Sequence, residues 1–253
     1  MSNPIHSERL MYGAPSTELT SSTSREVLRG EIDGLRTISY AVAPGQTVQL
    51  ETSAKEGRVY LFTAGNGTAG DGTTAHQIGE VALWAPRHDT PLSITAKDAP
   101  LLFLELVVDL SPTDMAELEQ NAARFPLFIS YADCKTYSER IKSDKTISRT
   151  LLPEHTFPRL CVGSVETAGD DRVAAHEHPM LEQLFFGLQD NDCVLRADAT
   201  ELAFGAGVLL HIPLGSRHGV VVHAPNKLHY IWIDLFKNRE GMAWIVQEHI
   251  PTP

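Results

Sequence analysis

The stretch 175–186 reads AHEHPMLEQLFF, and it decides how the chain is interpreted. His176 and His178 alternate along what reads as one strand, so both side chains leave the same face. Glu182 follows four residues after the second histidine, and the segment 207–218, GVLLHIPLGSRH, adds His218 behind a strand and a glycine-containing turn. Three imidazoles and one carboxylate form a mixed nitrogen and oxygen ligand set that suits a divalent metal ion. We therefore expect one metal site built from these four side chains.

The composition is that of an ordinary globular protein, since 42% of the 253 residues are hydrophobic and 21% are charged. This length allows one large or two small domains. No apolar run of about 18 residues is present, and the first residues, MSNPIHSERLMYG, lack the apolar segment of a secretory signal. Three widely spaced cysteines argue against a disulfide framework. These features predict a cytoplasmic protein.

The chain is acidic, with a formal net charge of −11. Nucleic acids and anionic membranes require a basic surface, so neither is an expected partner. A small anionic substrate remains compatible with this charge, because a pocket can be locally basic inside an acidic protein.

Short alternating or apolar runs, separated by glycine and proline turns, fill two parts of the chain. This pattern is typical of a sandwich or barrel of short strands. Between the two parts, Ser111-Pro112-Thr113-Asp114 has the start signals of a short helix. The prediction divides the chain into four segments: an N-terminal arm at 1–25, a first barrel at 26–110, a helical connector at 111–150 and a second barrel at 151–253.

The two β-rich parts can be aligned as a repeat, with Gly45 opposite Gly169. The positions of the first three ligands then correspond to residues of the first part that do not form a ligand set: Thr52, Ala54 and Arg58. The frame of strands and turns is kept while the ligands are lost. We therefore expect the first barrel to be a structural copy without a metal site.

The spacing H-x-H-x3-E at 176–182, followed by G-x5-P-x-G-x2-H at 207–218, resembles the two signature motifs of the cupin superfamily. The resemblance implies an all-β bicupin, in which two tandem double-stranded β-helix (jelly-roll) barrels are joined by the connector. It also implies that His176, His178, Glu182 and His218 hold one divalent ion in the second barrel. Zn, Mn, Fe, Ni and Co all accept this ligand set.

A narrower likeness covers roughly 145–236. The segments 145–149, 152–154, 163–166 and 190–193 are similar to the 4-deoxy-5-ketouronate isomerases and the 5-deoxyglucuronate isomerases. The likeness implies an aldose–ketose isomerase of carbohydrate metabolism, acting on a small oxidised sugar through an enediolate. That family has four residues between the second histidine and the glutamate, a position held here by Gln183. Glu182 and Gln183 both remain candidates for the fourth ligand.

Three side chains are candidate catalytic residues. Glu182 could carry the proton during isomerisation, and Tyr230 could donate one near the metal. Arg172 shares strand parity with His176 and His178, so it could face the barrel interior and hold a substrate carboxylate.

Other classes of function stay open. They are an iron-dependent cupin dioxygenase, an aminohydrolase of the ureidoglycine type and a non-catalytic sugar-binding cupin. In each case the expected partner is a small molecule, anionic or polyhydroxylated. Because exposed sheet edges need covering, we expect a homo-oligomer, most simply a homodimer.

Overall fold

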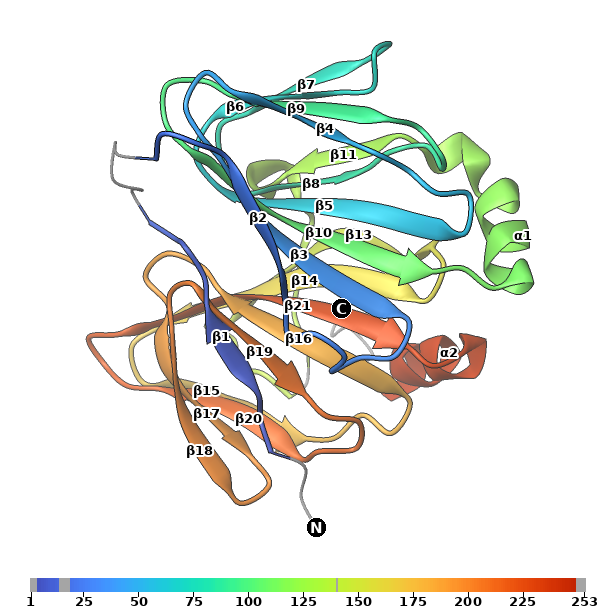
Figure 1. Ribbon diagram of the computed structural model, residues 1–253. Helices are drawn as coiled ribbons and strands as arrows, with labels where there is room; N and C mark the ends of the chain where they lie inside the picture. Colours follow the sequence, from blue (N-terminus) through green and yellow to red (C-terminus); the bar gives the residue numbers. More distant parts are fainter. Residues whose placement is uncertain (1–3, 14–18, 140, 249–253) are drawn as a thin grey trace. The chain divides into compact units, whose positions relative to one another are not determined.

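The computed structural model describes residues 4–13, 19–139 and 141–248. The chain divides into two compact units, which are considered separately. The N-terminal unit comprises residues 11–133, and the C-terminal unit comprises residues 134–253 together with residues 1–10. Figure 1 shows that both consist almost entirely of strands. Within the described part of the chain, no helix has the length and apolar character needed to cross a membrane.

The N-terminal unit is built from two antiparallel sheets. Its strands are β2 (Thr23–Val27), β3 (Leu35–Val42), β4 (Thr47–Leu50), β5 (Glu56–Ala64), β6 (Gly67–Gly70), β7 (Ala75–Ile78), β8 (Ala82–Ala85), β9 (Leu92–Ala96), β10 (Leu101–Asp109) and β11 (Leu127–Ser130). The larger sheet has the order β11-β8-β5-β10-β3-β2 and the smaller has the order β4-β9-β6-β7. Inward side chains from both sheets form one core that includes Phe62, Trp84 and Phe103.

The C-terminal unit has the same two-sheet construction. Its strands are β1 (Ser7–Arg9), β12 (Thr136–Tyr137), β13 (Ile147–Phe157), β14 (Leu160–Ala168), β15 (Asp171–His176), β16 (Leu181–Gly187), β17 (Asp192–Ala197), β18 (Thr200–Gly205), β19 (Val208–Ile212), β20 (His218–Val222) and β21 (Lys227–Phe236). The larger sheet has the order β1-β19-β16-β21-β14-β13-β12, and the smaller has the order β15-β20-β17-β18. Helix α2 (Arg239–Glu248) follows the last strand.

The strand orders of the two units correspond. The run β8-β5-β10-β3-β2 matches β19-β16-β21-β14-β13, and β4-β9-β6-β7 matches β15-β20-β17-β18. The two glycines that align the repeat, Gly45 and Gly169, both have the positive φ of a tight turn, +73° and +77°. The two units therefore repeat one topology, as the sequence alignment predicts.

The segments outside the predicted barrels contain strands as well as a helix. In the predicted connector, 111–150, helix α1 (Pro112–Gln120) begins with the expected capping box between Ser111 and Asp114. The same segment also contains β11, which pairs with β8, and β12, which pairs with β13. In the predicted N-terminal arm, β1 pairs with β19 at the edge of the larger C-terminal sheet.

Candidate metal centre

Three histidines of the C-terminal unit come together at one point. His176 ends β15, His218 begins β20, and the two residues face each other across the ladder. His178 lies in the loop after β15, and one ring nitrogen from each of the three histidines lies within 4.8 Å of the other two. His178 and His218 are only 3% and 2% exposed, whereas His176 is half-buried. The three histidine predictions therefore converge on one candidate metal site.

Backbone carbonyls orient two of these rings. His176 Nδ1 lies 2.8 Å from Ala174 O, and His218 Nδ1 lies 3.0 Å from Ser216 O. A carbonyl oxygen can only accept, so each Nδ1 must carry the proton. In a neutral imidazole this leaves the lone pair on Nε2, the atom that binds a metal ion. Two of the three rings are thus held in the tautomer that a metal site requires.

A β-bulge in β15 decides which side chains reach the interior. The pairing of β15 with β20 shifts register between Val173 and His176. Such an extra residue reverses the inward and outward alternation. Val173 therefore faces the core like His176, whereas Arg172 is exposed. Arg172 does not line the cavity described below, so the inward arginine expected from strict alternation is not found.

Gln183 is turned toward the same interior as the histidines. Its side chain lines the cavity and is 6% exposed, and Nε2 donates a 2.8 Å hydrogen bond to Asp234 Oδ1. Its Oε1 is buried and has no hydrogen-bond partner among the residues that the structure describes. Leaving a buried carbonyl oxygen unsatisfied costs roughly 1–3 kcal/mol. Coordination of a metal ion would satisfy this atom.

Glu182 points to the opposite face of β16 and does not join the histidine cluster. Its carboxylate accepts hydrogen bonds from His211 Nε2 at 3.0 Å, from the Leu214 amide at 3.0 Å and from Lys237 Nζ at 2.9 Å. Burial raises the pKa of Glu182, but the bonds from His211 and Lys237 outweigh it, so the pKa lies below its ordinary value. The predicted ligand Glu182 is therefore separated from the site, because adjacent strand residues face opposite ways and the interior position belongs to Gln183.

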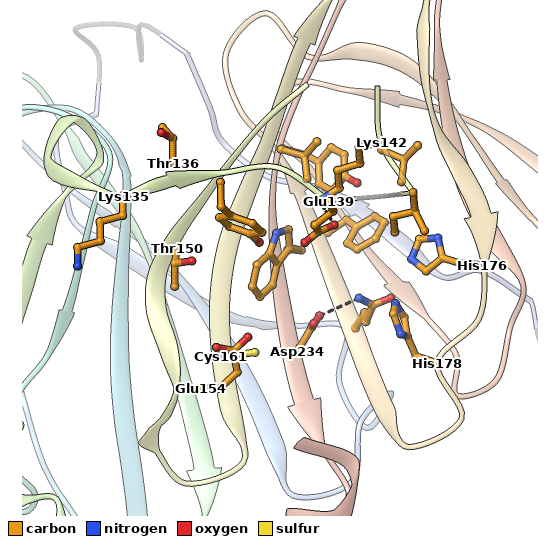
Figure 2. A pocket seen from close by; sticks show the side chains of 18 residues that line it. Lys135, Thr136, Glu139, Lys142, Thr150, Glu154, Cys161, His176, His178 and Asp234 are labelled. Atoms are coloured by element: carbon orange, nitrogen blue, oxygen red, sulfur yellow. Dashed lines mark hydrogen bonds and ion pairs between the residues drawn. The ribbon is translucent and has the colours of Figure 1, made fainter. Parts of the chain in front are cut away.

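His176 and His178 open on a cavity of 410 Å³ within the C-terminal unit. Figure 2 shows His176 and His178 at one end of it, Lys135, Thr136 and Thr150 at the other, and Asp234 between them. The residues that line it include polar and aromatic side chains: Lys135, Thr136, Tyr137, Glu139, Lys142, Thr150, Glu154, His176, His178, Gln183, Tyr230, Trp232 and Asp234.

A buried ion pair forms part of the cavity wall. Lys142 Nζ lies 2.6 Å from Glu139 Oε2, and each side chain is 7% exposed. Lys142 also donates to Ser148 Oγ at 2.9 Å. Burial lowers the pKa of Lys142 and outweighs the opposing attraction of Glu139. The pair thus places a carboxylate and an amine side by side in the wall of the cavity.

Tyr230, the predicted proton donor, does line the cavity. Its ring packs 4.7 Å from Phe185 and 5.5 Å from Phe204, centroid to centroid. Burial raises the pKa of Tyr230 well above its ordinary value, which keeps the phenol protonated. Its position is compatible with both packing and proton donation.

Sequence reasoning did not single out Glu139, Lys142 or Asp234. The first two lie in a segment without strand or helix periodicity, and the fold brings Lys142 beside Val173 through an isolated bridge. Asp234 is in β21, in alternation with Tyr230 and Trp232. A buried acid in an otherwise apolar strand, IWIDLF, is the one local signal that points to Asp234.

The N-terminal unit has a different polar group at the corresponding place. Tyr60 pairs with Glu105 as Gln183 pairs with Asp234. The fully buried Glu105 accepts hydrogen bonds from Tyr60, Tyr40 and Arg58. The described residues contain one cluster of potential metal ligands, the three histidines of the C-terminal unit.

No family model and no curated protein matches the sequence, but solved structures do. An oxalate decarboxylase from Bacillus subtilis, solved at pH 4.6, superposes with a TM-score of 0.66 at 14% identity, covering 94% of this chain and 77% of that one. The formate complex of the Lactobacillus farciminis oxalate decarboxylase gives a TM-score of 0.65 at 17% identity, with coverage of 94% and 87%. A cupin 2 conserved barrel domain protein from Leptotrichia buccalis gives 0.61 at 16% identity, with coverage of 86% and 90%. At these identities the likeness establishes the fold alone: the chain has the cupin fold.

Proposed function

We propose that the chain is a bicupin that binds one divalent metal ion in its C-terminal unit through His176, His178, His218 and Gln183. The two units repeat one topology, and the chain has the cupin fold. Both observations support the bicupin assignment. The three ring nitrogens within 4.8 Å of one another and the unsatisfied Gln183 Oε1 support the ligand set. Of the two candidates for the fourth ligand, Glu182 and Gln183, this proposal takes Gln183.

We further propose that the protein is an enzyme that isomerises a small oxidised sugar such as a keto-uronate. The observation that carries this proposal is the Glu139–Lys142 pair in the wall of the cavity that His176 and His178 also line. When bound, a divalent ion supplies Lewis-acid polarisation of a carbonyl oxygen. Isomerisation also requires a group that removes a proton from one carbon and returns it to its neighbour.

Glu139 is the proposed proton carrier. Its Oε2 lies 2.6 Å from Lys142 Nζ in an ion pair, and a neighbouring positive charge favours the ionised form of a carboxylate, which is the form that accepts a proton from carbon. Lys142 in turn is held by Ser148 and balances the negative charge whenever Glu139 is ionised. Gln183 and the histidines are neutral ligands, so they leave the full charge of a bound ion available to attract an anionic or polyhydroxylated substrate.

The size of the cavity favours a sugar over a two-carbon acid. Pockets for small organic molecules measure roughly 300–1,000 Å³, and this cavity measures 410 Å³. Decarboxylation of oxalate, suggested by the names of two structural neighbours, is a second candidate. That reaction would leave most of the cavity unfilled.

The test is turnover in deuterated buffer under argon. Metal-free protein is reloaded separately with Mn, Fe, Co, Ni or Zn and mixed with a 4-deoxy-5-ketouronate or with 5-deoxyglucuronate. Proton NMR should show the isomer with deuterium at the carbon that receives the proton. Glu139→Gln should lower kcat by roughly 10²–10⁴, whereas Glu166→Gln, whose carboxylate binds Arg149 outside the cavity, should retain activity.

Other outcomes identify the competing functions. Absence of turnover with every metal refutes the isomerase proposal. Oxygen-dependent turnover with iron indicates a dioxygenase, ammonia release from ureidoglycine indicates an aminohydrolase, and carbon dioxide from oxalate indicates a decarboxylase. Sugar binding that survives His176→Ala and His218→Ala indicates a non-catalytic binding protein.

A further inference from the structure

Glu182 is part of the histidine motif at 176–182, but its carboxylate makes its hydrogen bonds on the face of β16 opposite to the histidines. Three donors converge on its carboxylate: the His211 ring, the Leu214 amide and the Lys237 amine. Glu182 is 8% exposed and the His211 side chain is 5% exposed, whereas Lys237 reaches the carboxylate from a side chain that is 38% exposed. Hydrogen bonds to an ionised acceptor are stronger than bonds between neutral groups. The carboxylate is therefore a strong local anchor.

One of these donors, Leu214, lies in the turn at 213–216, and that turn contacts two of the histidines. The Gly215 amide donates to His178 O at 3.1 Å. Ser216 O accepts the proton of His218 Nδ1 at 3.0 Å. The position of this one turn therefore affects both the backbone of His178 and the orientation of the His218 ring.

A second donor, Lys237, links Glu182 to the loop between His178 and β16. The backbone amide of Lys237 donates to Met180 O at 3.0 Å, while its Nζ binds Glu182. The opposite side of the 213–216 turn is tied independently, because Ser216 Oγ donates to Asp198 at 2.8 Å. Glu182 thus joins β16, the loop before it and the turn after β19 in one bonded group.

We infer that Glu182 is a positioning residue that fixes the 213–216 turn and, through it, the metal-binding geometry of His178 and His218. This inference rests on the metal site proposed above. It assigns to Glu182 a role that differs from coordination and from proton transfer, since its carboxylate makes its bonds on the face of β16 opposite to Gln183. Bonds that orient metal ligands in this way typically change metal affinity by roughly 10–100-fold when they are removed.

The experiment measures cobalt binding by competition titration, together with the visible spectrum of the cobalt protein, for three variants. Glu182→Leu removes every acceptor and should weaken Co²⁺ binding by roughly 10–100-fold and alter the spectrum. Glu182→Gln keeps an oxygen that can accept from the Leu214 amide, so its affinity and spectrum should stay close to those of the unaltered protein. Asn191→Ala is the matched control: it removes buried bonds to His229 N and Phe204 O beyond the other end of β16. It should lower the unfolding free energy without changing cobalt affinity.

Two results would overturn the inference. Unchanged affinity and spectrum in Glu182→Leu would show that the anchor does not position the site. Equal and complete loss of binding in Glu182→Gln and Glu182→Leu would show that the carboxylate itself coordinates the ion. If Glu182→Leu does not fold, Glu182→Asp replaces it, because the shorter side chain keeps the charge but cannot span the same three donors. Glu182→Asp should then weaken cobalt binding, and unchanged affinity would count against the inference.

A measurement on metal-free protein separates this inference from the proposed function. Imidazole ¹⁵N–¹H correlation spectra report which nitrogen of His218 carries the proton. Glu182→Leu should reduce the population of the Nδ1-protonated form, whereas Glu182→Gln and Asn191→Ala should preserve it. Failure of the unaltered protein to bind any divalent metal would refute the proposed function, and these spectra would still decide the role of Glu182. Identical His218 spectra in all variants would refute that role.

Discussion

Replacing the amide of Gln183 with a carboxylate tests the proposed ligand arrangement directly. In the protein, Gln183 Nε2 donates to Asp234 Oδ1 over 2.8 Å. In Gln183→Glu an oxygen replaces this donor, and two carboxylates meet in a buried site. Two unit charges about 2.8 Å apart, at an effective dielectric constant of about 20, repel each other by about 6 kcal/mol.

The pair can avoid this repulsion by keeping one proton. Holding a glutamic acid protonated at pH 7, against an ordinary pKa of about 4.3, costs roughly 3.7 kcal/mol. This cost is smaller than the repulsion, so the pair should share a proton at neutral pH. The retained O–H can donate to Asp234, which replaces the hydrogen bond lost with the amide. We therefore expect metal-free Gln183→Glu to be about 3–4 kcal/mol less stable than the unaltered protein at pH 7.

The sign of the pH dependence follows from the raised pKa. The pKa of the pair is higher in the folded protein than in the unfolded one. The variant should therefore be as stable as the unaltered protein below about pH 4, and its free energy of unfolding should fall by roughly 1.4 kcal/mol for each pH unit above that. Urea unfolding of metal-free protein at pH 4.5, 6 and 7.5 measures this difference, with Gln183→Met as the control that removes the hydrogen bond to Asp234 without adding a second carboxylate. Co²⁺ should restore much of the stability at pH 7.5, because the cation favours both carboxylates ionised. A destabilisation that is absent at pH 7.5, or does not change with pH, would refute the placement of Gln183 against Asp234.

Three further predictions address the site and the two units. Unaltered protein should bind one cobalt ion per chain, and the double variant His176→Ala/His218→Ala should bind none, as measured by elemental analysis after desalting; full occupancy of the double variant would disprove the site. Gly163→Ala should cost roughly 1–3 kcal/mol by overpacking, because an added Cβ would lie 2.1 Å from Trp232 Cζ2 and 2.5 Å from Arg149 O. Gly79→Ala, with no atom within 4 Å of the added Cβ, is its control in urea unfolding, and equal midpoints for the two variants would contradict the packing. Glu105→Leu should destabilise the protein by roughly 3–5 kcal/mol, because Arg58 loses a buried partner, yet cobalt stoichiometry should not change; a gain or loss of bound cobalt would contradict the assignment of the single site to the C-terminal unit.

The all-β architecture and the three histidines could be predicted from sequence because each depends on local signals. Alternating strands, turn glycines and two spaced motifs all report on residues close in the chain. His176 and His218 meet because β15 and β20 pair. The likeness to solved structures supports the same fold.

The rest of the site depends on a bulge, a loop and tertiary contacts, which the hydrophobic periodicity of the sequence does not reveal. Strict alternation predicts that Arg172 faces the interior like His176. The bulge between Val173 and His176 adds one residue to the strand, so Arg172 faces outward instead. The chain leaves the strand after His176 and re-enters β16 at Leu181, so spacing alone could not decide between Glu182 and Gln183. Glu139 and Lys142 reach the cavity through tertiary contacts of a segment without a pattern.

The pairing of β1 with β19 has a consequence for how the protein is made. Arg9 pairs with Val208, so residues 7–9 complete a sheet whose partner strand is translated much later than they are. The N-terminal unit can fold while the ribosome is still translating the second half, and through that interval residues 7–9 must wait without their partner. A C-terminal fragment produced alone would present the bare edge of β19, and uncovered edges of this kind recruit strands from other chains. Production of the C-terminal unit as an independent protein therefore requires the segment that contains residues 7–9 to be supplied, either fused through a linker or added as a peptide.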